Sequence, residues 1–520
     1  MNHLVIMLLT STALIRLIPY LITGVPYHTD TYAILSFTEL LKSKTPTELI
    51  PNSGLGNYEI YWPGVAIYGI IHSVITGLGI KELTSITVPI INSLSTLILI
   101  PMLRSLGMSK TYSVIAALVF GLVGTEAVLG AGVTKEGYAA ALMMTTLTLT
   151  SLAIIRGFSN AYYLVVLTHS SLIITHHLTS VVTLLMMVYL ITAYLSSKVL
   201  IKRLLTSLAV LAINALTLLT YIYLHSIKAL PTLTALTASD IISLITYEYI
   251  ATLPIWFSLI SRSELKYLIR LWFAAIYVLV VALSIAAARV EIAYAAPRIS
   301  AYELLLFTPY LVIALLGIIS VGRISERCLS TYTYLVVLGF VGIELYLIFG
   351  TPGLISEAYR LSTFLYLGIS ILVAYTLSII KSKYLRSMIS LMISAALMMS
   401  AYVAPYTAFS SGYVGGSQRI YLPSDILLRD FIKYYIGNIT VCGDLRLHYL
   451  LYLYVDVDTY SGLLYLLNYS RLKCYLVINE LFKEVGYIAL QYGIPVNVDD
   501  YVLRDNSLIY VGGRNSLVGP

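Results

Sequence analysis

Long apolar runs recur from residue 4 to about residue 404, and this repetition is the strongest constraint on how the chain folds. A helix needs about 20 apolar residues to cross the hydrocarbon core of a bilayer. Only 11% of the 520 residues are charged, against about 25% in a soluble globular protein. These values exclude a chain of several soluble domains and a disordered chain. They predict a predominantly α-helical polytopic membrane bundle with about 13 spans.

The net charge of +7 comes from basic residues that stand in short clusters between the apolar runs. Such clusters mark cytoplasmic loops, so the charge indicates topology and no nucleic-acid partner is expected. The N-terminus is then cytoplasmic, and the tail from about residue 405 is extracytoplasmic. Sequons at Asn438 and Asn468 support this side for the tail. The basic clusters are Lys198, Lys202 and Arg203; Arg262, Lys266 and Arg270; Arg323 and Arg327; and Lys381, Lys383 and Arg386.

Two apolar segments, around 62–80 and 84–103, lie between the first span and the cytoplasmic residues Arg104 and Lys110. An odd number of crossings must separate the outer end of the first span from those cations. One of the two segments is therefore expected to lie in the interface or to re-enter the membrane. The sequence does not distinguish which one.

The tail is more polar than the rest of the chain and has a different periodicity. Short runs that end at Gly or Asn are typical of strands, and two longer stretches between them are typical of helices. Their alternation predicts a small α/β domain on the outer membrane face. The strands are expected at 439–443, 475–479 and 508–513, and the helices at 424–436 and 479–492.

The chain is thus divided into a transmembrane domain, residues 1–404, and an extracytoplasmic domain, residues 405–520. An outer loop at 23–61 belongs to the first domain. Cys442 and Cys474 both lie in the second domain. They can form a disulfide if that domain is extracytoplasmic.

The first outer loop carries an acid at each end, Asp30 directly after the first span and Glu59 before the next apolar segment. Between them, residues 31–42 place charged side chains on one side and apolar side chains on the other. This pattern predicts a helix that lies on the bilayer. Asp30 is interpreted either as the N-cap of that helix or as a functional acid.

A second outer turn, residues 130–136, ends with Lys135 and Glu136 near the outer end of a long apolar pair of segments. A carboxylate at the N-terminus of the following helix is favourable on electrostatic grounds alone. A structural and a functional role for Glu136 are therefore both open.

Histidines occur within the next apolar stretch, where their burial is costly and makes them functional candidates. A spacing of seven residues is expected to place His169 and His176 on one helix face. No carboxylate stands at a helical spacing that would complete a metal-ligand set, so no residue is assigned to a metal. His176 and His177 are interpreted as hydrogen-bonding a polar substrate or as part of a buried histidine network.

Arginines occur in two later outer loops, against the inside bias of positive charge: Arg298, and Arg360 close to Glu357. The guanidinium group is suited to bidentate recognition of phosphate oxygens. The alternative is an arginine that snorkels to the interface and pairs with Glu357.

Together these features resemble the GT-C superfamily of membrane glycosyltransferases. The resemblance rests on the acid after the first span, the interfacial loop, the Tyr-Glu-Ile-Tyr-Trp-Pro-Gly entry at 58–64, the acid at 136 and the outer α/β tail. That group includes the protein O-mannosyltransferases, the aminoarabinose transferases of lipid A and the catalytic subunit of oligosaccharyltransferase. The content of Ile, Leu and Tyr and the His-His-Leu-Thr stretch at 176–179 are similar to archaeal members. The likeness covers residues 1–180 by motif and the rest by architecture.

The resemblance implies transfer of a sugar from a polyprenyl-phosphate donor to a glycan, lipid or protein acceptor at the extracytoplasmic face. It implies that Asp30 is the general base or acceptor-orienting carboxylate and that Glu136 is the second acid. The remaining residues are assigned to the donor and its phosphate: Lys135, Arg298, Arg360, Glu59, His176 and His177.

The chain also departs from the family pattern. Asp30 is followed by Thr31 rather than by a second acid, so a requirement for a divalent metal, magnesium or manganese, is left open. The tail lacks a Trp-Trp-Asp-Tyr-Gly motif, and transfer to asparagine sequons is therefore not expected.

Two other functions compete with this one. A transporter of a small polar or lipid-linked solute is expected to carry mid-bilayer ionisable residues and internal repeats, whereas here the charges gather at one face. A non-catalytic scaffold whose tail binds a partner leaves the clustering of Asp30, Glu136 and the outer arginines without an explanation.

Overall fold

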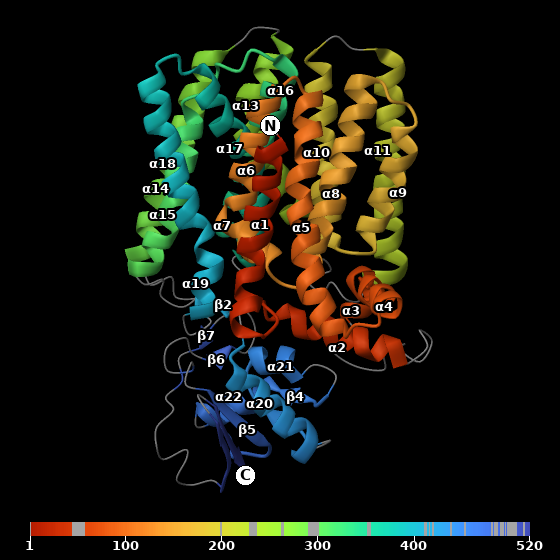
Figure 1. Ribbon diagram of the computed structural model, residues 1–520, viewed down its shortest axis with the longest axis vertical. Coiled ribbons are helices and arrows are strands. Elements are labelled where there is room, and N and C mark those ends of the chain that lie inside the picture. Colours follow the sequence, from red (N-terminus) through yellow and green to blue (C-terminus); the bar gives the residue numbers. More distant parts are fainter. Residues whose placement is uncertain are drawn as a thin grey trace.

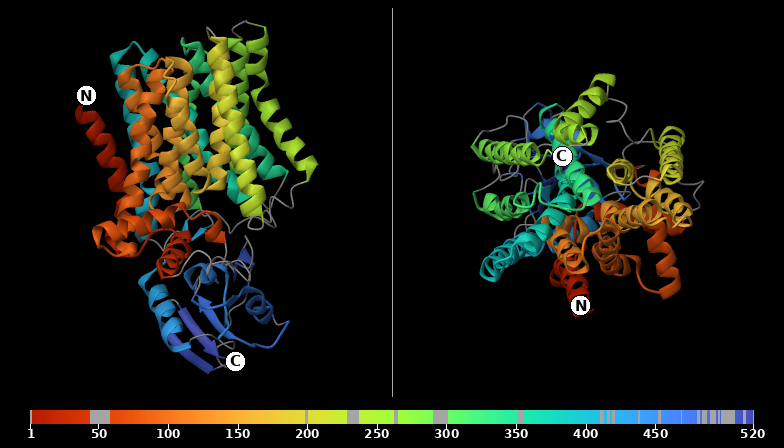
Figure 2. Two further views of the ribbon diagram at one scale, coloured as in Figure 1. Left: turned by 90° about the vertical axis from the view of Figure 1, so that its right-hand side faces the viewer. Right: turned by 90° about the horizontal axis from the view of Figure 1, so that it is seen from above.

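The structure is a computed structural model in which a bundle of long helices carries a small mixed domain at one end (Figures 1 and 2). We call the end of the bundle that contacts this domain the domain end. The described residues up to the start of the domain are 2–43, 58–197, 200–227, 237–261, 265–289, 301–350 and 355–409. In the domain they are 413–414, 417–418, 421–436, 439–451, 454–467, 469–479, 482, 487–488, 493–494, 496, 507–512 and 515–519.

Helices account for nearly all of the described residues before the domain. In chain order they are α1 (Asn2–Thr23), α2 (Asp30–Ser43), α3 (Tyr58–Tyr61), α4 (Gly64–Thr76), α5 (Ile80–Ser105), α6 (Lys110–Leu122), α7 (Gly124–Gly130), α8 (Lys135–Ser151), η3 (Leu152–Arg156), α9 (Ala161–Ile173), α10 (His177–Leu195), α11 (Ile201–Tyr221), η4 (Ile222–Ser226), α13 (Ala238–Ile260), α14 (Lys266–Arg289), α15 (Ala301–Ile318), α16 (Arg327–Phe349), α17 (Ile355–Ile379), α18 (Lys383–Ala401) and α19 (Val403–Phe409).

Among the described residues, 10 helices are long and apolar enough to cross a membrane, or 11 if α6 and α7, bent by 65°, form one span. This is fewer than the sequence predicted. The helix α4 has 13 residues, about 20 Å at 1.5 Å per residue, which is shorter than a hydrocarbon core of about 30 Å. Figure 1 shows α4 beside α2 at the domain end, whereas α5 runs through the bundle. The segment around 62–80 is therefore the one that does not span.

The helix directions agree with the predicted topology. The helices α11, α14, α16 and α18 each begin with basic residues at the end of the bundle away from the domain, and α1 begins there too (Figure 1). All described basic clusters thus lie at one end and the C-terminal domain at the other. Which side of a membrane each end faces stays a prediction.

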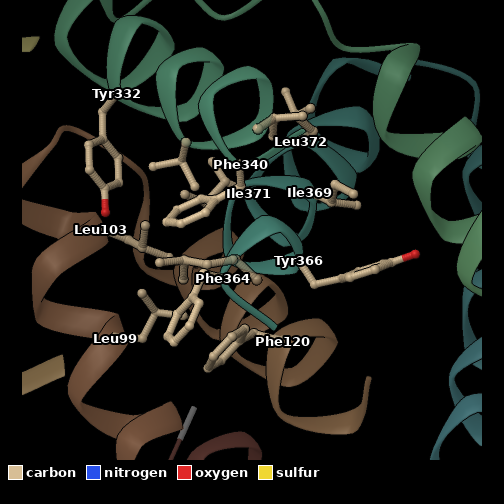
Figure 3. Packing of buried hydrophobic residues seen from close by; sticks show 14 of the residues in the cluster. Leu99, Leu103, Phe120, Tyr332, Phe340, Phe364, Tyr366, Ile369, Ile371 and Leu372 are labelled. Carbon is tan, nitrogen blue, oxygen red and sulfur yellow. The ribbon is translucent and has the colours of Figure 1, made fainter. Parts of the chain in front are cut away.

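The interior of the bundle is packed by apolar side chains from α5, α6, α16 and α17 (Figure 3). The rings of Phe340 and Phe364 lie 5.7 Å apart, and Leu99, Leu103 and Phe120 pack around them. Packing of this kind holds helices together in lipid, where burial from water supplies no driving force. It fixes the position of α17, whose first turns lie at the domain end.

The domain contains a five-stranded sheet in the order β4-β3-β5-β9-β8, as expected for a small α/β domain. Its first three strands are parallel and the last two pairings are antiparallel. The disulfide Cys442–Cys474 joins the end of β3 to the residue before β5, a pairing that the sequence left open. The strands and helices are β1 (Tyr413–Val414), β2 (Ser417–Gln418), α20 (Pro423–Phe431), η7 (Ile432–Ile436), β3 (Val441–Cys442), α21 (Leu445–Leu451), β4 (Val457–Asp458), α22 (Thr459–Leu466), β5 (Tyr475–Asn479), β6 (Tyr487–Ile488), β7 (Gly493–Ile494), β8 (Ser507–Gly512) and β9 (Asn515–Gly519).

One predicted element of the domain is wrong. A helix was expected over 479–492, but Tyr487 and Ile488 form a strand that pairs antiparallel with β7. A short apolar run is ambiguous between helix and strand, and here cross-strand pairing decides. The sequons at Asn438 and Asn468 lie outside the described residues.

The domain packs directly on the helix that begins with Asp30. The ring of Tyr421 meets the ring of Tyr32 on α2 edge to face at 4.8 Å. Both rings belong to one apolar cluster with Tyr27, Val128 and Leu428. The helix predicted over 31–42 is therefore present as α2, held between the bundle and the domain, and its position on a bilayer stays a prediction.

Candidate functional site

Charged side chains from three helix N-termini meet at the domain end. Arg360, in the second turn of α17, lies between Glu136 at the start of α8 and Asp30 at the start of α2. Its Nη1 is 3.0 Å from Glu136 Oε1 and its Nη2 is 3.9 Å from Asp30 Oδ2. The Asp30 and Arg360 side chains keep about 30% of their surface exposed. This Asp30–Arg360–Glu136 group forms the centre of the candidate site.

The loop before α2 places Asp30. His28 has a positive φ of 75°, an uncommon conformation for a residue with a side chain. Thr31 Oγ1 donates to the carbonyl of Tyr27 at 2.5 Å, and the Val133 amide donates to Thr31 Oγ1 at 3.1 Å. These bonds connect the start of α2 to the turn before α8. The Thr31 hydroxyl therefore links the two backbone segments that carry Asp30 and Glu136.

The position of Glu136 follows from the capping of α8. Thr134 is the N-cap and accepts a hydrogen bond from the Gly137 amide at 2.9 Å. Glu136 then lies in the first helical turn, where the helix dipole favours a negative charge. Glu136 therefore both places a negative charge in the first turn of α8 and contacts Arg360.

His176 lies where α9 and α10 are interrupted and points its Nε2 toward Glu136 Oε1 at 3.4 Å. Its Nδ1 accepts from the Thr179 amide and so caps α10. Burial lowers the pKa of His176 to about 4, so the imidazole is neutral at physiological pH and can accept the capping bond. The prediction that His169 and His176 share one helix face is wrong, because the helix is interrupted between them: α9 ends at Ile173 and His176 caps α10. The His169 ring forms a hydrogen bond with the Ser180 carbonyl instead.

Glu59 and Lys135 form a second, buried pair beside this group. Lys135 Nζ is 2.9 Å from Glu59 Oε2, and both side chains are less than 10% exposed. Burial raises the pKa of Glu59, and the lysine opposes that shift. The Lys135 ammonium also lies 5.7 Å from the centre of the Trp62 ring, which in turn is 4.6 Å from the ring of His177. Trp62 and the Glu59–Lys135 pair therefore pack together beside His177 and next to Glu136.

Replacement of Lys135 by methionine should destabilise the protein by about 3–5 kcal/mol, because it leaves the Glu59 carboxylate buried without its cation. Thermal unfolding in lipid nanodiscs measures the change. The double variant Glu59→Gln with Lys135→Met should recover most of the loss. Equal destabilisation of the double variant would show that the pair does not act as a unit.

A small cavity of about 20 Å³, with room for about one water molecule, extends from this group into the bundle. Glu136 and Arg360 line one part of it, and Asn92 and Glu126 line another. Leu178 and Phe364 are among its apolar walls. The site is therefore a charged rim above a mainly apolar hollow within the helices.

The structure brings together seven of the eight residues that the sequence assigned to the site, although it does not test their roles. The eighth, Arg298, lies outside the described residues. The seven are Asp30, Glu59, Lys135, Glu136, His176, His177 and Arg360.

Sequence reasoning missed other charged groups of this region. His28 Nδ1 lies 3.7 Å from Asp30 Oδ2, and Arg16 and Glu126 are fully buried close by. The signals were present: Arg16 interrupts an otherwise uncharged apolar run, and Glu126 lies only ten residues before Glu136. Glu126 is thus a further charge at the same end of the apolar pair of segments as Lys135 and Glu136.

No family model matches the sequence, and no curated protein sequence does either. Solved structures do match. The oligosaccharyltransferase of Archaeoglobus fulgidus in the apo form aligns with a TM-score of 0.52 at 11% identity, over 92% of this chain and 70% of its own. The same enzyme, AglB, in complex with an inhibitory peptide and a dolichol-phosphate aligns at 0.50 and 12% identity, over 92% and 69%. The fold resembles that of the GT-C membrane glycosyltransferases.

A second GT-C structure also aligns with this chain. ArnT from Cupriavidus metallidurans matches over 99% of this chain and 97% of its own, with a TM-score of 0.40 and 13% identity. At such identities the GT-C likeness concerns the fold, and the activity has to be argued from the site itself.

The A. fulgidus enzyme was crystallised in a complex with Zn and sulfate. In the part of this chain that the structure describes, no group of His, Cys, Asp and Glu side chains converges as a metal site requires. The cation that lies between Asp30 and Glu136 is the guanidinium of Arg360. The described residues do not fit a divalent metal, and no step of the reaction proposed below passes through one.

Proposed function

We propose that this protein is a GT-C-type glycosyltransferase that moves a sugar from a polyprenyl-phosphate donor to an acceptor hydroxyl at the extracytoplasmic membrane face. The observation that carries this proposal is the arginine held between two carboxylates at the domain end of a membrane bundle. A lipid-linked donor presents its phosphate at this depth, and the acceptor approaches from the aqueous side. The partly exposed Asp30 and Arg360 are accessible to both.

In the proposed reaction the bond between the sugar anomeric carbon and the phosphate oxygen breaks, and a bond to the acceptor oxygen forms. The phosphate leaves with the electron pair, and the acceptor proton passes to the Asp30 carboxylate. A positioned general base of this kind contributes about 10²–10⁴-fold to a rate. Asp30 suits the role because it is anchored by the α2 turn and its contact with Arg360 is long, at 3.9 Å.

The leaving phosphate needs positive charge, and Arg360 is assigned to supply it. A fixed guanidinium stabilises charge that develops in a transition state, and its fork matches two phosphate oxygens. Glu136 holds Arg360 through the shorter contact of 3.0 Å, and His176 supports Glu136. Glu136 is thus proposed as the residue that orients the cation, and His176 as its support.

The resemblance in fold supports a polyprenyl-phosphate donor, because AglB was solved with a bound dolichol-phosphate. A glycan, lipid or protein acceptor fits the proposal equally. The transporter alternative is less well supported, because Asp30, Glu136 and Arg360 lie together at the domain end, whereas transporters bind their solute near the middle of the bilayer.

Purified protein in nanodiscs should release polyprenyl phosphate from polyprenyl-phosphate hexoses when a pool of candidate acceptors is present. Thin-layer chromatography of the radiolabelled lipid measures the release, and mass spectrometry of the acceptor fraction measures the transferred sugar. Solute flux into proteoliposomes without donor cleavage would favour the transporter and overturn the proposal.

A further inference from the structure

An arginine lies fully buried in the first span of the bundle. Arg16 on α1 donates from Nη1 to the carbonyls of Thr12 at 3.0 Å and Gly121 at 3.1 Å. Its Nη2 is 3.5 Å from Glu126 Oε1 on α7. Burial of a charged group inside a membrane bundle is costly, and such residues are retained mostly where they have a function. None of the proposed catalytic steps uses Arg16 or Glu126.

Asn92 on α5 connects this buried pair to the candidate site. Its Oδ1 accepts from Arg16 Nε at 2.5 Å, and its Nδ2 donates to the Gly137 carbonyl at 3.1 Å. Gly137 directly follows Glu136 in the chain. The amide of Asn92, which is almost completely buried, therefore ties the first turn of α8 to α1 and α7.

The packing around this connection leaves little freedom. A Cβ atom at Gly130, the last residue of α7, would overlap both Asn92 Oδ1 and Arg16 Nε. Asn92 and Glu126 also line the cavity into which Glu136 and Arg360 face. The buried network and the Glu136–Arg360 pair thus share one hollow and one helical turn.

We propose that Arg16, Asn92 and Glu126 form a positioning network that sets the Glu136 carboxylate against Arg360. Each polar group of the network has its partner within the bundle, so the start of α8 is held from the membrane side. The capping bond of Thr134 holds the same turn from the other side. These bonds fix the first turn of α8 and so restrict the orientation of the Glu136 side chain. The end of a helix without such bonds is free to fray.

The first test is a double-mutant cycle on donor cleavage, and it rests on the proposed function. Asn92→Ala should lower kcat at least tenfold and leave KM for the donor within about twofold. If Asn92 acts through Glu136, adding Glu136→Gln to Asn92→Ala should cost less than threefold more, although Glu136→Gln costs more than that in the wild-type background. Multiplicative effects of the two changes would overturn the proposal.

The matched control is Asn214→Ala. Asn214 on α11 is equally buried, and neither polar atom of its side chain has a hydrogen-bond partner among the residues that the structure describes. It should leave kcat and the full effect of Glu136→Gln unchanged. If Asn92→Ala does not fold, Asn92→Asp serves instead, because it keeps an acceptor for Arg16 and removes only the donor to Gly137.

The second test does not depend on glycosyl transfer. Hydrogen exchange measured by mass spectrometry should show faster exchange at residues 135–140 in both Asn92 variants and unchanged exchange there in Asn214→Ala. Unchanged exchange in the Asn92 variants would overturn the network whatever the activity. Faster exchange with an inactive wild-type protein would place the failure in the proposed function alone.

Discussion

Replacement of Asp30 by asparagine should lower the rate of donor cleavage by about 10²–10⁴-fold, the contribution of a positioned general base. The amide keeps the size of the carboxylate but cannot take the acceptor proton. Binding of the donor should change little, because Asp30 contacts Arg360 only at 3.9 Å. Release of polyprenyl phosphate under saturating donor measures kcat, and the thermal shift induced by polyprenyl phosphate alone measures binding.

Glu39→Gln is the matched control for this prediction. Glu39 lies on the same helix as Asp30 and is exposed. The substitution makes the same carboxylate-to-amide change and should leave cleavage unchanged. A cleavage rate for Asp30→Asn within about threefold of the wild-type value would remove Asp30 from the role of base.

Replacement of Arg360 by alanine should lower kcat by about 10²–10³-fold and raise KM for the donor, because it removes the cation assigned to the leaving phosphate. It also brings the Asp30 and Glu136 carboxylates together without the charge between them. Arg360→Lys should be intermediate, since it keeps the charge but loses the bidentate fork. Addition of guanidinium ion should restore part of the activity of the alanine variant.

The control for Arg360 is Arg323→Ala at the opposite end of the bundle. Arg323 is exposed and contributes one of the basic clusters that indicate topology. Its replacement should leave donor cleavage unchanged. Cleavage by Arg360→Ala at the wild-type rate would be incompatible with its assignment to the phosphate.

Apolar runs and charge clusters were sufficient to predict the bundle and the helix over 31–42, but they left open whether Cys442 and Cys474 form a disulfide. They were not sufficient to count the spans, because α4 is mostly apolar and yet too short to cross a bilayer. They also could not separate helix from strand near Tyr487, where pairing with β7 decides. The length of each helix and the pairing of distant strands are set when the chain folds, and the composition of a segment does not determine them.

The site shows the same limit. Asp30, Glu136 and Arg360 were identified because each is a charge at the expected outer end of an apolar run. The Glu59–Lys135 pair and the contact of His176 with Glu136 join segments far apart in the chain, so a pattern in one segment could not show them. Arg16 was missed because a lone cation within a span carries no periodic signal, although its cost of burial marks it.

The contact of Tyr421 with Tyr32 has a consequence for the proposed activity. The helix α2, which begins with Asp30, packs on one side against a domain that lies far from it in the sequence. The proposed base is therefore held by the C-terminal domain as well as by the bundle. We expect removal of the domain to weaken donor cleavage even though Asp30 and the bundle remain.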